Sequence, residues 1–325
     1  MVVVVGALLL GACTSSSGTA PTNATAGSTV PSTLAAPSTL AAPTTLAAAT
    51  TLAPSTLPPT TPAPTTLPPT TLPPTTPAPT APPTTTVPVV EAAAYTVLDQ
   101  RSGAVLASSN ADTPLPVGSL MKLLTADAVY AAGDPVKIVT APEGLVIDPM
   151  ESIIGVVPGQ QLQRDTLTRA MLVVSANDAA RALAVDIAGS EAAFAEVMNA
   201  RAAALGLANT HAVNVTGLDA DGQFSTTNDM VRLGAYLMGN QTFQASARQP
   251  SATLNGQTIE ATNDLLRTYP GADGIKTGHT TQAGWCIVAS ANRAGRRIIV
   301  AVFGAPTEEA RNAAATSLLD WGFTQ

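Results

Sequence analysis

A serine and a lysine three residues apart have the types and the spacing of a nucleophile and its base. Ser119 and Lys122 stand at positions i and i+3, so a helix would place the hydroxyl and the amine on one face. Serine is a weak nucleophile at its free pKa, and a neutral amine beside it can accept its proton. For Lys122 to be neutral near pH 7, its pKa must fall by about three units from roughly 10.4, which burial and a second cation nearby could supply. The pair therefore indicates acyl-transfer chemistry.

Two more polar groups follow along the chain. Ser175-Ala176-Asn177 lies between two expected helices, in the kind of loop that presents polar side chains to a cleft. Lys276-Thr277-Gly278 lies on an expected strand, with His279 directly after it. Each motif alone is unspecific, because Ser-x-x-Lys occurs by chance, Ser and Asn favour helix caps, and a strand lysine usually faces solvent. Only their combination points to a catalytic site.

Together, in this order and with these spacings, the three motifs resemble those of penicillin-binding proteins and serine β-lactamases. Residues around them narrow the resemblance to the low-molecular-weight D-alanyl-D-alanine carboxypeptidases, over about residues 92–325. These neighbours are Asp178-Ala179-Ala180, Asn214 with Gly217-Leu218, Ser225–Met230 and Asp273–Thr280. Two departures leave the local packing open: Val117-Gly118 stands where the family usually has Pro-Ala, and Met121 replaces a residue that is commonly polar.

The resemblance implies a role for each residue of the first two motifs. Ser119 would attack the peptide carbonyl and form an acyl-enzyme, with Lys122 accepting its proton. Ser175 would relay a proton to the departing D-alanine. Asn177 would bind the substrate amide and help to hold Lys122.

The third motif would bind the end of the substrate. Lys276 and Thr277 would meet the terminal carboxylate, and the backbone N–H groups of Ser119 and His279 would form the oxyanion hole. Arg311 resembles the family's carboxylate-binding arginine, although an arginine in a first helical turn is as often solvated.

The expected activity is removal of the terminal D-alanine from peptidoglycan stem peptides, with β-lactam antibiotics as inhibitors and without a cofactor or metal. A D,D-endopeptidase would use the same acyl chemistry and stays open. A class A β-lactamase is disfavoured, because no Glu-x-x-Leu-Asn segment lies between Ser175 and Lys276 and the middle motif has Ala176 rather than Asp. A non-catalytic peptidoglycan-binding lipoprotein with a decayed site is disfavoured by the intact motifs.

Periodicity and turn residues indicate the elements that must position these groups. A strand hairpin is expected over 95–98 and 104–107, and a helix from about Ser119 to Ala132 that ends at Gly133. Further helices are expected over 166–174, 178–187, 191–205 and 230–238, strands over 274–277, 285–290 and 297–303, and a last helix from the cap Thr307 to about Trp321. Thr226 with Asp229 resembles a capping box, and Asn214 with Gly217 favours a turn.

This order predicts an α/β (α+β) fold of the β-lactamase/transpeptidase type. The N-terminal hairpin would join the C-terminal strands in one antiparallel sheet flanked by helices, and the helices between would form an all-helical lobe.

The chain before the catalytic domain, expected over 91–325, divides in two. Residues 1–13 form a short apolar run that resembles a lipoprotein export signal, with Cys13 as the lipid-bearing residue; a plain cleavable signal is the alternative. Residues 14–90 are rich in Thr and Pro and predict a disordered tether, about 75 residues long, that could reach roughly 230 Å in extended form. The protein is therefore expected at the outer face of the cytoplasmic membrane, held by an N-terminal lipid.

Composition excludes two other classes of function. With 15 Lys and Arg against 22 Asp and Glu, the net charge is −7, so no nucleic acid partner is expected. The cluster Arg293, Arg296 and Arg297 is interpreted as a solvated hairpin tip. Two cysteines, Cys13 and Cys286, exclude a disulfide framework and a four-thiolate metal site.

Overall fold

The computed structural model describes residues 86–325, apart from 147, 149 and 255. The expected signal segment with Cys13 and the expected tether up to residue 85 lie outside the described residues. Both therefore stay predictions. Residues 86–90 have no regular secondary structure.

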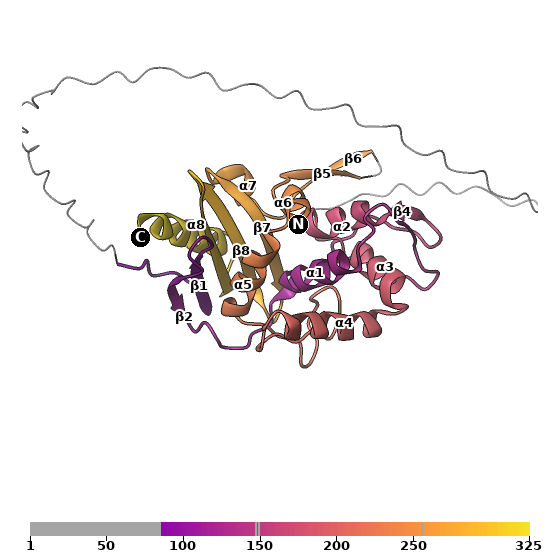
Figure 1. The fold of residues 1–325 in the computed structure, drawn as a ribbon, viewed down its shortest axis with the longest axis horizontal. Coiled ribbons are helices and arrows are strands. Elements are labelled where there is room, and N and C mark those ends of the chain that lie inside the picture. The colour runs from indigo at the N-terminus through magenta and orange to yellow at the C-terminus, as the bar shows by residue number, and fades with distance from the viewer. Residues whose placement is uncertain (1–85, 147, 149, 255) are drawn as a thin grey trace, which may run out of the picture. The chain divides into compact units, whose positions relative to one another are not determined.

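A five-stranded antiparallel sheet, in the order β2-β1-β9-β8-β7, joins the two ends of the described chain. Its strands are β1 (Ala94–Asp99), β2 (Val105–Ser109), β7 (Ala272–Thr280), β8 (Gly284–Arg293) and β9 (Arg296–Ala305). Strand β1 pairs with β9 in the register Tyr95↔Val302. Figure 1 shows the indigo hairpin beside the yellow strands, as the sequence predicted.

The central strands of this sheet are buried on both faces, because their side chains alternate between two hydrophobic clusters. In β9, Ile299 and Ala301 face the cluster that includes α1 and α5, whereas Ile298 and Val300 face the cluster with the C-terminal helix. The continuous apolar runs of β8 and β9 are therefore explained by helices on both sides (Figure 1).

The helices confirm the predicted lobe with small shifts of their ends. They are α1 (Lys122–Ala132), α2 (Arg164–Val173), α3 (Asn177–Ala188), α4 (Glu191–Ala204) and α5 (Thr227–Leu237). The expected last helix, α8 (Glu308–Thr324), packs against the sheet. Thr226 caps α5 by accepting from the Asp229 N–H, and Thr307 caps α8 in the same way. The capping box is incomplete, because the Asp229 carboxylate accepts from Asn209 and Thr210 instead.

Several short elements were not predicted from the sequence as elements of their own. These are η1 (Gly118–Met121), β3 (Ile138–Thr140), β4 (Gln161–Gln163), α6 (Gln241–Ala247), β5 (Ser251–Leu254), β6 (Gln257–Glu260) and α7 (Leu265–Thr268). All are three to seven residues long, which is too short for a hydrophobic period to distinguish them from loops.

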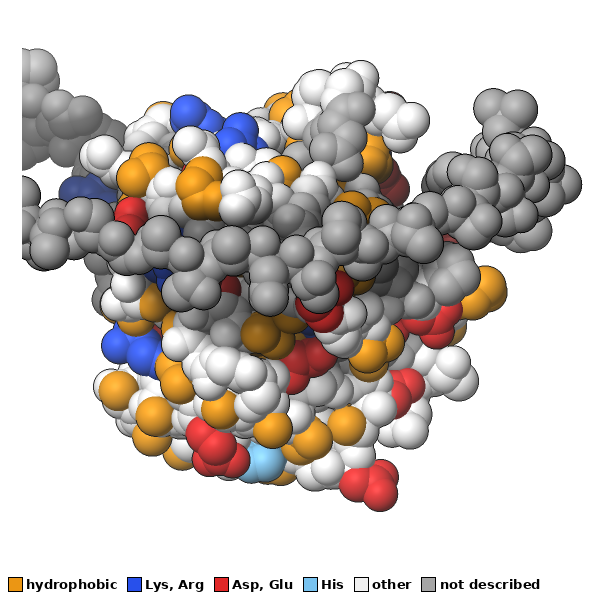
Figure 2. Space-filling model, turned by 90° about the vertical axis from the view of Figure 1, so that its right-hand side faces the viewer, with side chains coloured by type: hydrophobic (Ala, Val, Ile, Leu, Met, Phe, Trp, Pro, Cys, Tyr) orange, Lys and Arg blue, Asp and Glu red, His pale blue; other side chains and the backbone are white. Residues whose placement is uncertain are grey.

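The interpretation of the arginine cluster as a solvated tip holds for Arg293, whose side chain is 40% exposed, and is wrong for Arg296 and Arg297, whose side chains are 28% and 15% exposed. Arg297 pairs with Asp273 at 2.7 Å, Arg296 with Asp99 at 2.8 Å, and Arg293 with a carboxylate of α8 at 3.0 Å. The carboxylates come from distant segments, so nothing in the sequence around the arginines indicated them. On the face in Figure 2, Lys and Arg side chains lie in separate small groups with acidic side chains between them.

No helix within the described part of the chain is long and apolar enough to cross a membrane.

Candidate active site

The Ser119 side chain lies on the 3-10 turn η1, one step before α1, rather than in the α-helix that the sequence predicted. In a 3-10 turn, residues i and i+3 stand almost directly above one another. Lys122 Nζ accordingly lies 2.9 Å from Ser119 Oγ and also donates to the Thr216 carbonyl at 2.6 Å. The expected proximity of hydroxyl and amine is therefore present.

The Lys122 amine has lost its contact with water, since the residue is fully buried. Burial lowers the pKa of Lys122 well below its ordinary value, repulsion from Lys276 and Arg181 lowers it further, and the Glu151 carboxylate opposes the shift. An amine in this environment favours its neutral form, which can accept a proton from a hydroxyl.

Two glycines allow the backbone of other segments to reach the turn that carries Ser119. A Cβ on Gly278 of β7 would lie 2.4 Å from the Val117 carbonyl, and one on Gly217 would lie 2.0 Å from the Gly118 carbonyl. Asn214 Oδ1 holds the second segment by accepting the Gly217 N–H at 2.8 Å. This turn presents the carbonyl of Thr216 to Lys122, which gives Asn214 and Gly217 the structural roles expected from the sequence.

Ser175 and Asn177 stand at the junction of α2 and α3. Ser175 has φ 65°, in the left-handed region that a non-glycine residue seldom adopts. Asn177 opens α3 and is buried, and its Nδ2 donates to Glu151 Oε2 at 2.7 Å. Its expected role in holding Lys122 stays a prediction. Its Oδ1 is buried without a partner among the described residues.

A second buried cation stands on β7. Lys276 Nζ donates to the Thr277 carbonyl at 3.0 Å, and Thr277 Oγ1 donates to Thr262 Oγ1 at 2.7 Å. Burial lowers the pKa of Lys276 to about 7, with a contribution from the positive charge of Arg311.

Arg311 is not the solvated residue that a first helical turn often carries, because its exposed fraction is 2%. It lies on α8, pairs with Glu308 at 2.8 Å, and its Cζ is 5.5 Å from the Trp285 ring centroid. Its positive charge acts on Lys276, so the two residues form a buried positive pole on β7 and α8.

His279 brings its backbone, not its ring, to the turn that carries Ser119. A Cβ on Gly118 would lie 2.8 Å from His279 N, so the two expected oxyanion donors lie on segments in close contact. The imidazole lies against the Trp285 ring, with ring centroids 4.1 Å apart and ring planes tilted by 32°.

The sequence reading missed Glu151, Arg181 and the carbonyl of Thr216. A signal existed for Arg181, which stands four residues after Asn177 and therefore on the same face of α3. For Glu151 none existed, because it lies in an irregular segment between β3 and β4.

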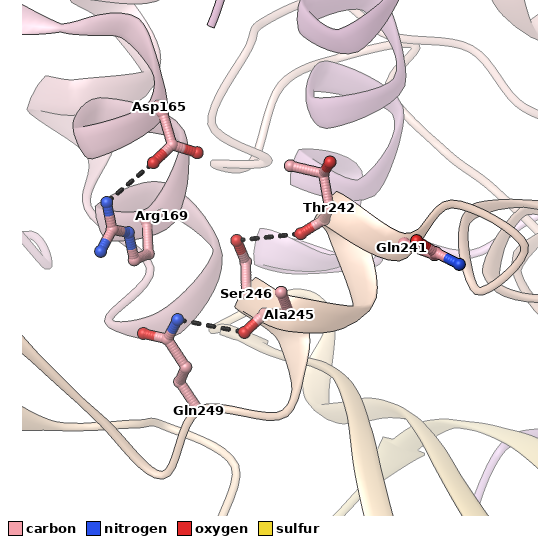
Figure 3. A pocket seen from close by; sticks show the side chains of 7 residues that line it. All are labelled: Asp165, Arg169, Gln241, Thr242, Ala245, Ser246 and Gln249. Carbon is pink, nitrogen blue, oxygen red and sulfur yellow. Dashed lines mark hydrogen bonds and ion pairs between the residues drawn. The ribbon is translucent and has the colours of Figure 1, made fainter. Parts of the chain in front are cut away.

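A groove of about 410 Å³ lies elsewhere, between α2 and α6. None of the expected site residues lines it. Figure 3 shows that three of its polar side chains have partners within the groove: Arg169 pairs with the Asp165 carboxylate, Ser246 Oγ donates to the Thr242 backbone carbonyl, and Gln249 Nε2 donates to the Ala245 backbone carbonyl. No group of three or more side chains able to hold a metal occurs in the described ranges.

Comparison with known proteins gives a consistent result. The family model of D-alanyl-D-alanine carboxypeptidase matches residues 81–307. DacA of Escherichia coli is 38% identical over 249 residues, covering 72% of this chain and 61% of that protein, so the chain spans less than two thirds of this relative's length. DacB2 of Mycobacterium tuberculosis is 36% identical, over 71% of this chain and 82% of that protein. The crystal structure of penicillin binding protein 6B from E. coli superposes with a TM-score of 0.71 at 34% identity, covering 75% and 81%.

Proposed function

The chain belongs to the D-alanyl-D-alanine carboxypeptidase family, and on that premise we propose that it removes the terminal D-alanine from peptidoglycan stem peptides through an acyl-enzyme at Ser119. The observation that carries this proposal is the 2.9 Å contact between Ser119 Oγ and the fully buried Lys122 Nζ. Burial favours the neutral form of the amine, and a neutral amine within hydrogen-bond distance of a hydroxyl can accept its proton.

In the first step, Ser119 Oγ attacks the carbonyl of the penultimate D-alanine and its proton passes to Lys122. The N–H groups of Ser119 and His279 stabilise the charge on the carbonyl oxygen, because fixed donors gain most where charge newly develops. Lys122 then returns this proton through the Ser175 hydroxyl to the departing amine, as the C–N bond breaks and D-alanine leaves. Water releases the acyl group by the same steps in reverse order.

The substrate's terminal carboxylate is assigned to the positive pole of β7 and α8. Lys276 and Thr277 meet it directly, and buried Arg311 adds positive potential. A carboxylate placed there would restore the charged form of Lys276, whose pKa burial lowers to about 7. The Asn177 side chain binds the substrate amide through its unpartnered Oδ1.

The setting of this activity is part of the proposal. The short apolar signal and Cys13 support export and lipid attachment, and the Thr/Pro-rich segment 14–90 supports a long tether to the catalytic domain 91–325. The partners are then stem peptides at the outer face of the cytoplasmic membrane, with β-lactams as inhibitors. No nucleic acid partner is expected for an acidic chain.

Mass spectrometry of the full chain tests both parts. Incubation with penicillin should add the antibiotic's mass to the peptide that contains Ser119, and a D-Ala-D-Ala pentapeptide should release D-alanine. Ser119→Ala should lose both, whereas the control Ser246→Ala should keep them. The N-terminal peptide of the membrane-bound protein should begin at Cys13 and carry a lipid.

A folded chain without an adduct at Ser119 would contradict the proposal. Rapid hydrolysis of penicillin would favour a β-lactamase, and cleavage of cross-linked peptides alone would favour the endopeptidase. A peptide that begins before Cys13, or lacks lipid, would remove the membrane anchor from the proposal.

A further inference from the structure

Glu151 joins two residues of α3 beside the candidate site. Its carboxylate accepts from Asn177 Nδ2 at 2.7 Å and from both Arg181 nitrogens, Nη1 at 2.7 Å and Nη2 at 2.9 Å. The bidentate geometry fixes the plane of the carboxylate. Side-chain exposed fractions of 9% for Arg181 and 12% for Glu151 show a pair largely removed from solvent.

The residues that follow Glu151 are tied to α3. The buried Asp178 carboxylate accepts the N–H groups of Ile154 and Val156, and the Asn177 N–H donates to the Ser152 carbonyl at 2.7 Å. Glu151 therefore has a defined position, although its segment lacks regular secondary structure.

This pairing decides which end of the Asn177 amide is free. An amide has a donor end and an acceptor end, and Glu151 can only accept while it is ionised. The Nδ2 end is consequently bound to Glu151, and Oδ1 is left buried without a partner in the described structure. Burial raises the pKa of Glu151, but hydrogen bonds from Arg181 and Asn177 outweigh it and hold the pKa below its ordinary value, so the carboxylate stays charged.

Glu151 and Arg181 shift the pKa of Lys122, the proposed general base, in opposite directions. Beyond the dominant effect of burial, Lys276 on β7 and Arg181 on α3 lower the pKa of Lys122, while Glu151 raises it. Glu191 of α4 also faces Arg181, at 3.6 Å from its Nε. If Glu151 or Arg181 is removed, the charge of the other residue acts on Lys122 without its opposite.

We propose that Glu151 and Arg181 form one positioning pair that points Asn177 Oδ1 toward the substrate amide and keeps the charge around Lys122 balanced. This inference rests on the proposed function, because it assigns the pair to the same acylation step. Neither residue touches the reacting atoms.

The test compares Glu151→Gln with Arg181→Met in the full chain. The rate of penicillin acylation is measured against pH, and the pKa of Lys122 is measured by NMR with lysine labelled at Cε. The chain has only three lysines, Lys122, Lys137 and Lys276, and the signal lost in Lys122→Ala identifies the base. We expect the acid limb and the pKa to move down in Glu151→Gln and up in Arg181→Met, each by about half a pH unit or more.

Orientation of the amide has its own readout. The side-chain amide introduced by Glu151→Gln would offer a donor as well as an acceptor, so Asn177 would lose its fixed orientation in this variant, and acylation at the optimal pH should fall about tenfold. Arg181→Lys, which keeps the charge, should restore the wild-type pH limb.

Asp127→Asn is the matched control, because it removes another buried carboxylate from the helix that carries Lys122. The partner of Asp127 is Arg201 of α4, which lies 2.7 Å away and is 29% exposed. This variant should lower the unfolding temperature without shifting the acid limb of the pH dependence of acylation. Shifts of the same sign in the two variants, or none, would overturn the inference while a wild-type adduct kept the proposed function. If the wild-type chain forms no adduct, both the proposed function and this inference are contradicted. Should Arg181→Met fail to fold, the inference is tested by the pH of the acid limb in Glu151→Gln and Arg181→Lys alone.

Discussion

At the scale of single residues, the site depends on two buried lysines with opposite requirements. Under the proposed mechanism, Lys122 must give up its proton to act as a base, whereas Lys276 must keep its proton to attract a carboxylate. Burial lowers both pKa values, and each lysine has a different second influence: Lys122 experiences Lys276, and Lys276 experiences Arg311. The charge of Lys276 thus helps to keep Lys122 neutral as a base. The charge of Arg311, however, makes it easier for Lys276 to lose the proton with which it would attract a carboxylate.

This balance predicts a bell-shaped dependence of kcat/KM on pH for a D-Ala-D-Ala peptide. Activity rises on the acid side as Lys122 loses its proton, and it falls as pH increases through about 7, where the free enzyme's Lys276 loses its charge. Lys276→Arg keeps a charge at every accessible pH and should flatten the basic limb. Steady-state kinetics between pH 5 and about 10 measure both limbs, and thermal unfolding verifies that the variant is folded. A basic limb that persists in the variant would assign it to another group.

At the scale of elements, the site forms where the edge strand β7 meets η1. The chain can bring the two backbones together only because Gly278 has no side chain at their contact: a Cβ there would lie 2.4 Å from the Val117 carbonyl and 3.1 Å from Ser119 N. This close approach also accounts for the 3-10 geometry at Ser119, since the turn is packed against β7 before α1 begins.

Gly278→Ala should therefore separate β7 from the turn that carries Ser119. Overpacking of this kind typically costs about 1–3 kcal/mol, and a shift of His279 N–H would slow acylation roughly a hundredfold through the oxyanion hole. Denaturant unfolding and the penicillin acylation rate give the two measurements. Gly144→Ala is the control, because a Cβ at that glycine meets nothing within 4 Å. Equal behaviour of the two variants would show that the contact is not needed.

At the scale of the whole molecule, strands from near the two ends of the described residues pair within one sheet. Strand β1 lies between β2 and β9, and its residues 94–99 pair with residues 298–303. Such long-range pairing forms late and leaves a strand edge open until it is complete. The hairpin therefore belongs to the core, although it comes first in the catalytic domain.

Removal of the hairpin should prevent folding. We expect a fragment of residues 86–325 to unfold cooperatively and to acylate like the full chain, and a fragment of residues 111–325 to aggregate, because β9 would become an exposed apolar edge. Circular dichroism during heating and the penicillin adduct test both fragments. A soluble, acylated 111–325 fragment would contradict this account of the sheet.

The main elements followed from the sequence because their signals are local. Ser119 and Lys122 come together within one turn, Thr226 and Thr307 cap helices through hydrogen bonds three residues away, and the alternating cores of β8 and β9 follow from uninterrupted apolar runs. The short strands and helices lacked such a signal, since three to seven residues do not establish a period.

The sequence by itself determined which chemistry was possible, because the residue types and the i, i+3 spacing of the nucleophile and base are properties of one helical turn. Only the tertiary structure decided how these groups are tuned. The burial of Arg311, the pairing of Glu151 with Arg181, and the close approach of Gly278 to η1 join segments that are far apart along the chain. Desolvation and charge proximity depend on distance in space, and no local pattern of residues encodes them.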